Sequence, residues 1–178
     1  MLLMYAGTAL AQGIKIPAPS PTQTIKQDFA LSNIALSYSR PLKNGRVIMG
    51  DLVPYGKVWR TGANSATTIT FGEDVKFGDV AVKAGKYGLL TIPGAPTWTV
   101  ILTSSLDVTS PAAYKAENDI ARVKVKPVAL PFSQESFTIE FEKVRANSVV
   151  LALSWDKTKV PVVITADIDG KITAHIEE

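Results

Sequence analysis

The sequence contains no cysteine and only one histidine among its 178 residues. The lack of cysteine excludes disulfide frameworks, thiol nucleophiles, cysteine-bound zinc and iron–sulfur clusters. The single histidine, His175, lies in the last four residues, where we predict a solvated terminal strand. A general base must be oriented by its neighbours and lie close to its target. We therefore predict no catalytic residue, no metal ion and no cofactor.

Charge is also limited, with 19 Lys and Arg against 16 Asp and Glu, for a net charge of +3. The basic residues are spread along the chain and form no concentrated stripe, so we predict no nucleic-acid partner. Apolar residues make up 46% of the chain, which excludes a disordered chain, a collagen-like fibre and a coiled coil. A chain of this length forms one domain that buries its core without disulfides.

The first residues are uncharged and end in Ala9-Leu10-Ala11, which is similar to a secretory cleavage site. The positively charged region with which a signal peptide starts is missing, so we interpret residues 1–11 as the remnant of a signal peptide. We therefore predict that the protein is exported to the periplasm or the medium. The apolar run is too short to cross a bilayer, and we predict no transmembrane segment. Residues 12–24, with Pro17, Pro19 and Pro21, are predicted to form an extended arm. Residues 25–178 then form a single domain.

Apolar residues recur at every second position through most of this domain, which is typical of half-buried β-strands. Gly78-Asp79 and Asp169-Gly170 are typical of hairpin turns. We therefore predict an all-β protein, an antiparallel two-sheet β-sandwich that is jelly-roll-like or a partly open barrel. One short helix is predicted near residues 111–118, with Pro111 at its first position and Ser110 as its cap. The clearest alternating sets are 34–38, 98–102, 137–141, 149–155, 160–164 and 172–176.

One segment, Ser39 to Asn64, lacks this alternation and is rich in arginine, glycine and aromatic residues. Guanidinium groups suit carboxylates and phosphates, and Tyr and Trp offer flat faces for sugars. The segment is therefore predicted to line a pocket for an anion or a carbohydrate. An alternative is purely structural, with Arg60 paired to Asp51, Glu73 or Asp74 and Trp59 in the core. The candidate ligand-binding residues are Arg40, Arg46, Tyr55, Trp59, Arg60 and Asn64.

The same segment resembles a bacterial family called domain of unknown function 2911. The resemblance rests on Ser39-Arg40-Pro41, Gly45-Arg46 and above all the run from Leu52 to Asn64, LVPYGKVWRTGAN. It continues in Trp98-Thr99-Val100-Ile101 and in the run from Trp155 to Pro161, and covers roughly residues 17 to 168. The resemblance implies an exported protein of Gram-negative bacteria, often Bacteroidetes, with one β-rich domain. It transfers no catalytic residue.

Three functions are compatible with the sequence. The first is a non-catalytic binding module for a small anionic or carbohydrate ligand, or for a partner in the cell envelope. The second is a hydrolase acting on carbohydrate, which would need two carboxylates in one cleft. The third is a structural or assembly protein of the envelope. We favour the binding module, because no pair of acidic residues is singled out by the sequence.

Overall fold

The computed structural model describes residues 16–168 and residue 170. The predicted signal-peptide remnant, residues 1–11, lies outside this range. So do His175 and the strand predicted at 172–176, together with Asp169 of the predicted turn. In the described part no helix is long and apolar enough to cross a membrane.

The described chain folds into ten strands in two antiparallel sheets, which confirms the predicted all-β sandwich. The first sheet has the strand order β1-β2-β3-β6-β7-β8, and the second has the order β5-β4-β10-β9. Both sheets are open, and neither closes into a barrel. The strands are β1 (Thr22–Phe29), β2 (Ser32–Ser39), β3 (Thr68–Phe71), β4 (Val75–Phe77), β5 (Val80–Val82), β6 (Gly85–Ile92), β7 (Trp98–Thr103), β8 (Asp119–Val125), β9 (Val128–Glu142) and β10 (Ser148–Thr165).

The strand β1 begins at Thr22, so the last three residues of the predicted arm pair with β2. The hairpin predicted around Gly78-Asp79 is present, with Phe77 opposite Val80 in β4 and β5. Gly78 has a φ of +61°, which a glycine adopts without the strain that a side chain would cause.

The core between the sheets is built from the inward-facing residues of these alternating strands, as period-two patterning requires. The core includes a buried tyrosine, Tyr38, whose hydroxyl joins the two sheets. This hydroxyl accepts a hydrogen bond from the Ile139 amide at 2.9 Å and donates to Gln23 Oε1 at 2.8 Å. The largest fully buried side chains include Tyr38, Phe71, Phe77, Phe137, Ile34, Leu36, Ile69 and Leu89.

Replacing Tyr38 by phenylalanine is expected to destabilise the fold by about 1–3 kcal/mol, because the buried Ile139 amide loses its partner. Urea unfolding measures the change. The matched control is Tyr87→Phe, which removes a hydroxyl that donates to the Lys83 carbonyl at an exposed site and is expected to cost less than about 1 kcal/mol. Equal losses in the two variants would contradict the role given to Tyr38.

The helix predicted near residues 111–118 is replaced by two 3-10 turns, Pro111–Ala113 and Ala116–Asn118. Extended backbone at Tyr114 separates them, and Ser110 makes no side-chain cap although Pro111 does lie at the start. The loop carrying these turns packs on the outer face of the first sheet, where Tyr114 and Val108 meet Leu90 and Ile101. Packing against the sheet thus outweighs the weak helix propensity of this short stretch.

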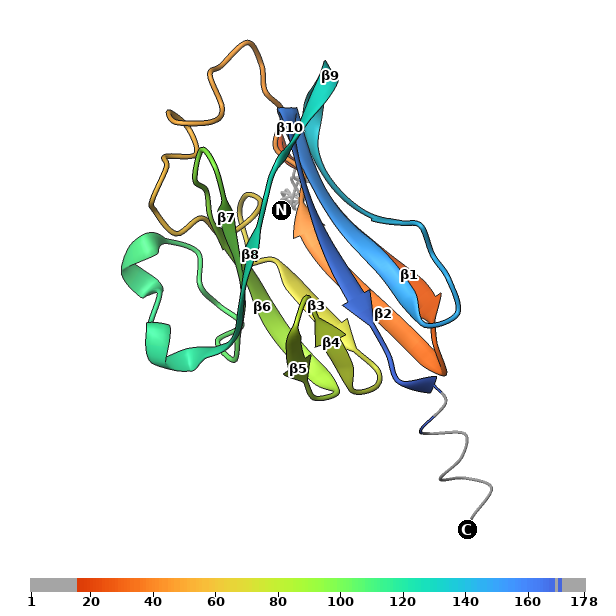
Figure 1. Cartoon of the computed structure of the whole chain (residues 1–178). Coiled ribbons are helices and arrows are strands. Elements are labelled where there is room, and N and C mark those ends of the chain that lie inside the picture. Colours follow the sequence, from red (N-terminus) through yellow and green to blue (C-terminus); the bar gives the residue numbers. More distant parts are fainter. Residues whose placement is uncertain (1–15, 169, 171–178) are drawn as a thin grey trace, which may run out of the picture.

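The irregular segment predicted around Ser39–Asn64 connects β2 to β3 and spans both sheets at one end of the sandwich. At its start, Pro41 accepts a hydrogen bond from the Phe137 amide in β9. Near its end, Trp59 and Thr91 of β6 exchange both backbone hydrogen bonds, at 2.7 and 3.0 Å. Figure 1 shows this segment, orange to yellow, looped out beside β7 and the ends of β9 and β10. Its two ends are therefore fixed to the sheets, and its middle is anchored by Ile48 and Val53, which are buried in the core.

Candidate functional site

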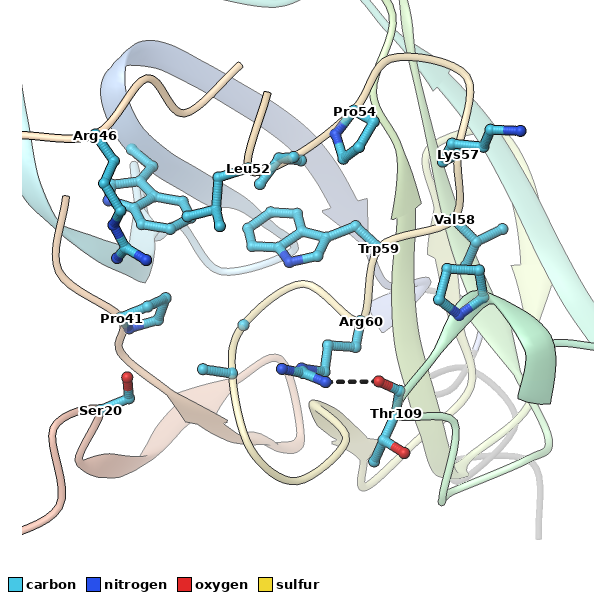
Figure 2. Close-up of a pocket in the computed structure, with 15 residues that line it drawn as sticks. Ser20, Pro41, Arg46, Leu52, Pro54, Lys57, Val58, Trp59, Arg60 and Thr109 are labelled. Carbon is cyan, nitrogen blue, oxygen red and sulfur yellow. Dashed lines mark hydrogen bonds between the residues drawn. The ribbon is translucent and has the colours of Figure 1, made fainter. Parts of the chain in front are cut away.

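A cavity of about 430 Å³ opens where this segment meets the second sheet and the loop before the 3-10 turns. Cavities of this size fall within the range used by small-molecule sites. Figure 2 shows the Trp59 indole in the middle of the hollow, with Arg46 and Arg60 reaching toward the space beside it from opposite sides. The lining residues are Ser20, Pro41, Arg46, Leu52, Val53, Pro54, Lys57, Val58, Trp59, Arg60, Gly62, Ala63, Thr109, Pro111 and Trp155.

The cavity has an aromatic floor made by Trp59 and Trp155. Their rings are stacked, with centroids 5.8 Å apart and planes 17° from parallel. Phe137 lies edge-on to Trp59 at 4.9 Å and joins this floor to the core. Trp155 is buried and donates its indole N–H to the Glu135 carbonyl at 3.1 Å. Trp59 therefore packs against the core, as the structural interpretation predicts, and also lines the cavity.

Arg60 supplies the central positive charge of the cavity. Its Nη1 donates to the Thr109 carbonyl at 2.6 Å, which fixes the guanidinium against the loop before the 3-10 turns. Its Nε atom is buried and has no hydrogen-bond partner. No carboxylate of the described chain lies within ion-pair distance of it, so the predicted alternative of a pair with Asp51, Glu73 or Asp74 is not formed. The buried Nε–H without an acceptor and the lack of a carboxylate partner favour an anion beside this guanidinium.

Two further cations line the cavity. Arg46 is held in place because its Nε and Nη2 donate to the carbonyls of Lys43 and Leu42. The ammonium of Lys57 points away from the hollow in Figure 2. The lining contains no aspartate or glutamate. The cavity therefore carries an uncompensated positive charge that comes mainly from the two arginines.

The other three candidate residues do not line this cavity. Arg40 donates to the Phe137 carbonyl and to Thr138 Oγ1, and so holds the segment to β9. Asn64 donates its amide to the Ser20 carbonyl and ties the arm to the end of the segment. Tyr55 is 48% exposed and borders a separate hollow of about 240 Å³, next to Met49 and Trp98.

The backbone that carries Arg60 is strained just after it. Thr61 is fully buried with a φ of +57°, which is unusual for a β-branched residue. Its hydroxyl lies 3.1 Å from Thr91 Oγ1, and its carbonyl accepts from Thr67 Oγ1 at 2.8 Å. Strain of this kind persists only where surrounding contacts impose it, and it is common at binding sites.

The start of the segment is held by an ion pair outside the cavity. Lys43 Nζ lies 2.6 Å from Asp156 Oδ1, and Ser133 donates to the same oxygen at 2.7 Å. Asp156 has a φ of +50° and lies where the pairing of β9 and β10 shifts register. The hydrogen bond from Lys43, followed by that from Ser133, lowers the pKa of Asp156 below its ordinary value.

Because the folded-state pKa of Asp156 is lowered, this group contributes stability above its unfolded pKa of about 3.9 and loses it as pH falls through the folded pKa. Asp156→Asn, which also tolerates positive φ, is therefore expected to be less stable than the wild type by up to about 1 kcal/mol at pH 6. The difference should shrink toward zero near pH 2. Urea unfolding across this range measures it, with Glu117→Gln, an exposed carboxyl, as control. A difference that stays constant with pH would contradict the ion-pair role.

Several lining residues were not predicted as part of a site. Thr109 comes from a distant loop, and Trp155 belongs to an alternating strand that is typical of core. Proline and leucine side chains such as Pro41 and Leu52 form the walls, and no residue pattern distinguishes them from ordinary loop residues. Across residues 16–168 and 170, no cluster of three or more His, Asp or Glu side chains is arranged to hold a metal ion.

Comparison with known proteins gives one match. Neither the curated proteins nor the solved structures include a significant match to this chain. A family model described as "Protein of unknown function (DUF2911)" matches residues 20–164, which include nearly all of both sheets, the irregular segment and the whole cavity lining. Since this match spans well over half of the sequence, the protein belongs to the DUF2911 family.

Proposed function

We propose that the protein is a binding module for a small anionic ligand, which occupies the cavity beside Arg60. The observation that carries the proposal is the guanidinium of Arg60, whose buried Nε has no hydrogen-bond partner and which has no carboxylate of the described chain within ion-pair distance, in a cavity lined by arginines and no acidic residue. A charge in that position is stabilised when an anion binds, because charge-assisted hydrogen bonds are the strong ones.

The hydrolase alternative gains no support from this cavity. Carbohydrate hydrolysis by two carboxylates needs both acids in the cleft that holds the sugar. The lining residues include serine, threonine, arginine and lysine, but neither aspartate nor glutamate. We also propose, from Ala9-Leu10-Ala11 alone, that the ligand is met outside the cytoplasm.

A ligand screen tests this function. Thermal unfolding of the wild type is followed with neutral sugars, organic acids, sugar acids and phosphates at one ionic strength. A ligand at a hundred-fold excess over its dissociation constant stabilises the native state by about 2.7 kcal/mol. We expect acids to raise the melting temperature and their neutral counterparts to leave it unchanged. No response to any anion would contradict the proposal.

Two variants, Arg60→Met and Lys57→Met, each remove one positive charge, and their comparison shows where the anion binds. In Arg60→Met, the affinity for the acids found in the screen is expected to fall about 10- to 150-fold, as for a lost hydrogen bond to a charged group. Lys57→Met removes a charge from the same lining, but its ammonium points away, and we expect less than a three-fold change. Equal effects of the two variants would show that general electrostatic attraction, and not a site at Arg60, binds the anion.

A further inference from the structure

We infer that the ligand carries its charge as a carboxylate on a ring, with the ring lying on Trp59 and the carboxylate on Arg60. This inference rests on the proposed function and adds the chemical class of the ligand. It follows from three features of the cavity: the edge of the Arg60 guanidinium that has no acceptor in the described chain, the flat aromatic floor and the apolar walls.

The donors suit a carboxylate better than a phosphate. One end of the Arg60 guanidinium is committed to the Thr109 carbonyl, and two nitrogens of Arg46 are committed to backbone carbonyls. The 3-10 turn that borders the cavity begins with Pro111, which has no N–H to offer. Phosphate sites usually add backbone amides at a helix N-terminus or a nest. What the cavity offers is the edge of the Arg60 guanidinium formed by Nε and Nη2, for which the described chain supplies no acceptor, and this planar fork matches the two oxygens of a carboxylate.

The floor suits a ring. Trp59 is held flat by its stacking on Trp155 and its edge contact with Phe137, so its orientation is fixed before a ligand arrives. A preorganised flat surface favours a rigid ring over a flexible chain, because little conformational freedom is lost on binding. Both aromatic rings and the apolar faces of sugar rings pack on an indole.

The walls of the cavity indicate that the rest of the ligand is uncharged. A carboxylate alone fills only a small part of 430 Å³. The remaining wall is formed by Pro41, Leu52, Val53 and Pro54, which offer no charge. Polar groups border the cavity as well: the Ser20 hydroxyl points toward the hollow in Figure 2, and the Thr109 carbonyl binds Arg60. The shared chemistry is a ring-borne carboxylate, and the ring comes either from a sugar acid or from an aromatic acid.

The test uses matched compounds and isothermal titration at constant ionic strength. Glucuronate and benzoate carry a ring and a carboxylate. Glucose and benzyl alcohol have the same rings but no charge. Gluconate and acetate have the carboxylate but no ring. Phenyl phosphate has the aromatic ring, with a phosphate in place of the carboxylate. We expect glucuronate or benzoate to bind at least ten-fold tighter than all five comparison compounds. Which of the two binds tighter identifies the source of the ring.

A variant separates the ring contact from the charge contact. Trp59→Leu keeps apolar bulk at the core and removes the flat face, and circular dichroism checks that it folds. Its affinity for the ring carboxylate is expected to fall about three- to ten-fold, the range of an aromatic contact, while that for acetate stays unchanged. Gluconate binding as tightly as glucuronate, or phenyl phosphate binding tighter than benzoate, would overturn the inference. If Arg60→Met still weakens binding in that case, the proposed function stands; if no anion binds, both fail.

Discussion

Replacement of Trp155 by alanine is expected to lower the free energy of unfolding by about 3–5 kcal/mol. The Trp155 side chain is 2% exposed and stacks on Trp59. It also contacts Phe137, with ring centroids 5.7 Å apart. Its loss leaves a void in the cavity floor and leaves the Glu135 carbonyl with the Lys43 amide as its one remaining donor in the described chain. Urea unfolding followed by circular dichroism measures the change.

Trp155→Phe serves as the control, because it keeps an aromatic ring and removes only part of the volume and the indole N–H. We expect it to cost about half as much as the alanine variant, since a smaller void remains. A loss of less than about 1 kcal/mol in Trp155→Ala would mean that the floor is not packed as described, since a surface residue typically costs that little.

Replacement of Gly62 by alanine is expected to destabilise the fold by about 2–4 kcal/mol, through backbone strain and crowding together. Gly62 has a φ of +155°, and an added Cβ would lie 3.0 Å from the Ser39 carbonyl oxygen and 3.0 Å from Thr67 Oγ1. Because Gly62 follows the turn at Thr61 and lines the cavity, its displacement would also move Arg60.

The matched control is Gly56→Ala, which lies in the same segment. Gly56 has a φ of +73°, but an added Cβ meets no atom within 4 Å. We therefore expect Gly56→Ala to lose only the free energy needed to place a side chain at positive φ, about 1–2 kcal/mol. Thermal unfolding of the two variants therefore separates strain from crowding. If the two variants were equally stable, this would contradict the close contact between Gly62 and the Ser39 carbonyl of β2.

Most strands can be predicted from the sequence, because the alternation of apolar and polar residues shows which face of a strand is buried. The patterns 149–155 and 160–164 show this well: inward residues are odd-numbered in the first and even-numbered in the second. The structure joins both into β10, with register shifts around Asp156 that absorb the change of phase. The sequence alone suggests two strands, because the alternation changes phase between these two sets; in the structure Asp156, with a positive φ, lies at that change. The extension of β9 back to Val128 was also not predicted, since its first nine residues are mostly exposed and do not alternate.

The site was predictable only as a segment. Arginine, tryptophan and glycine concentrate between Ser39 and Asn64, and the segment does border a cavity. Which of its polar residues face that cavity depends on tertiary contacts. Arg40 donates to β9, and Tyr55 packs over Gly50, where an added Cβ would lie 3.0 Å from the ring. Thr109, which orients Arg60, lies 49 residues away in the sequence, and nothing in its local pattern indicates the contact.

The side-chain NMR resonance of the Arg60 Nε–H, assigned by its absence in Arg60→Met, reports directly on an anion bound in this cavity. This N–H is buried beside the cavity, whereas Arg40 and Arg46 use theirs on backbone carbonyls. Titration with glucuronate and with benzoate is expected to shift the Arg60 resonance, with a midpoint equal to the dissociation constant from calorimetry. A saturable shift of other arginine resonances, with Arg60 unchanged, would contradict the assignment of this cavity as the anion site.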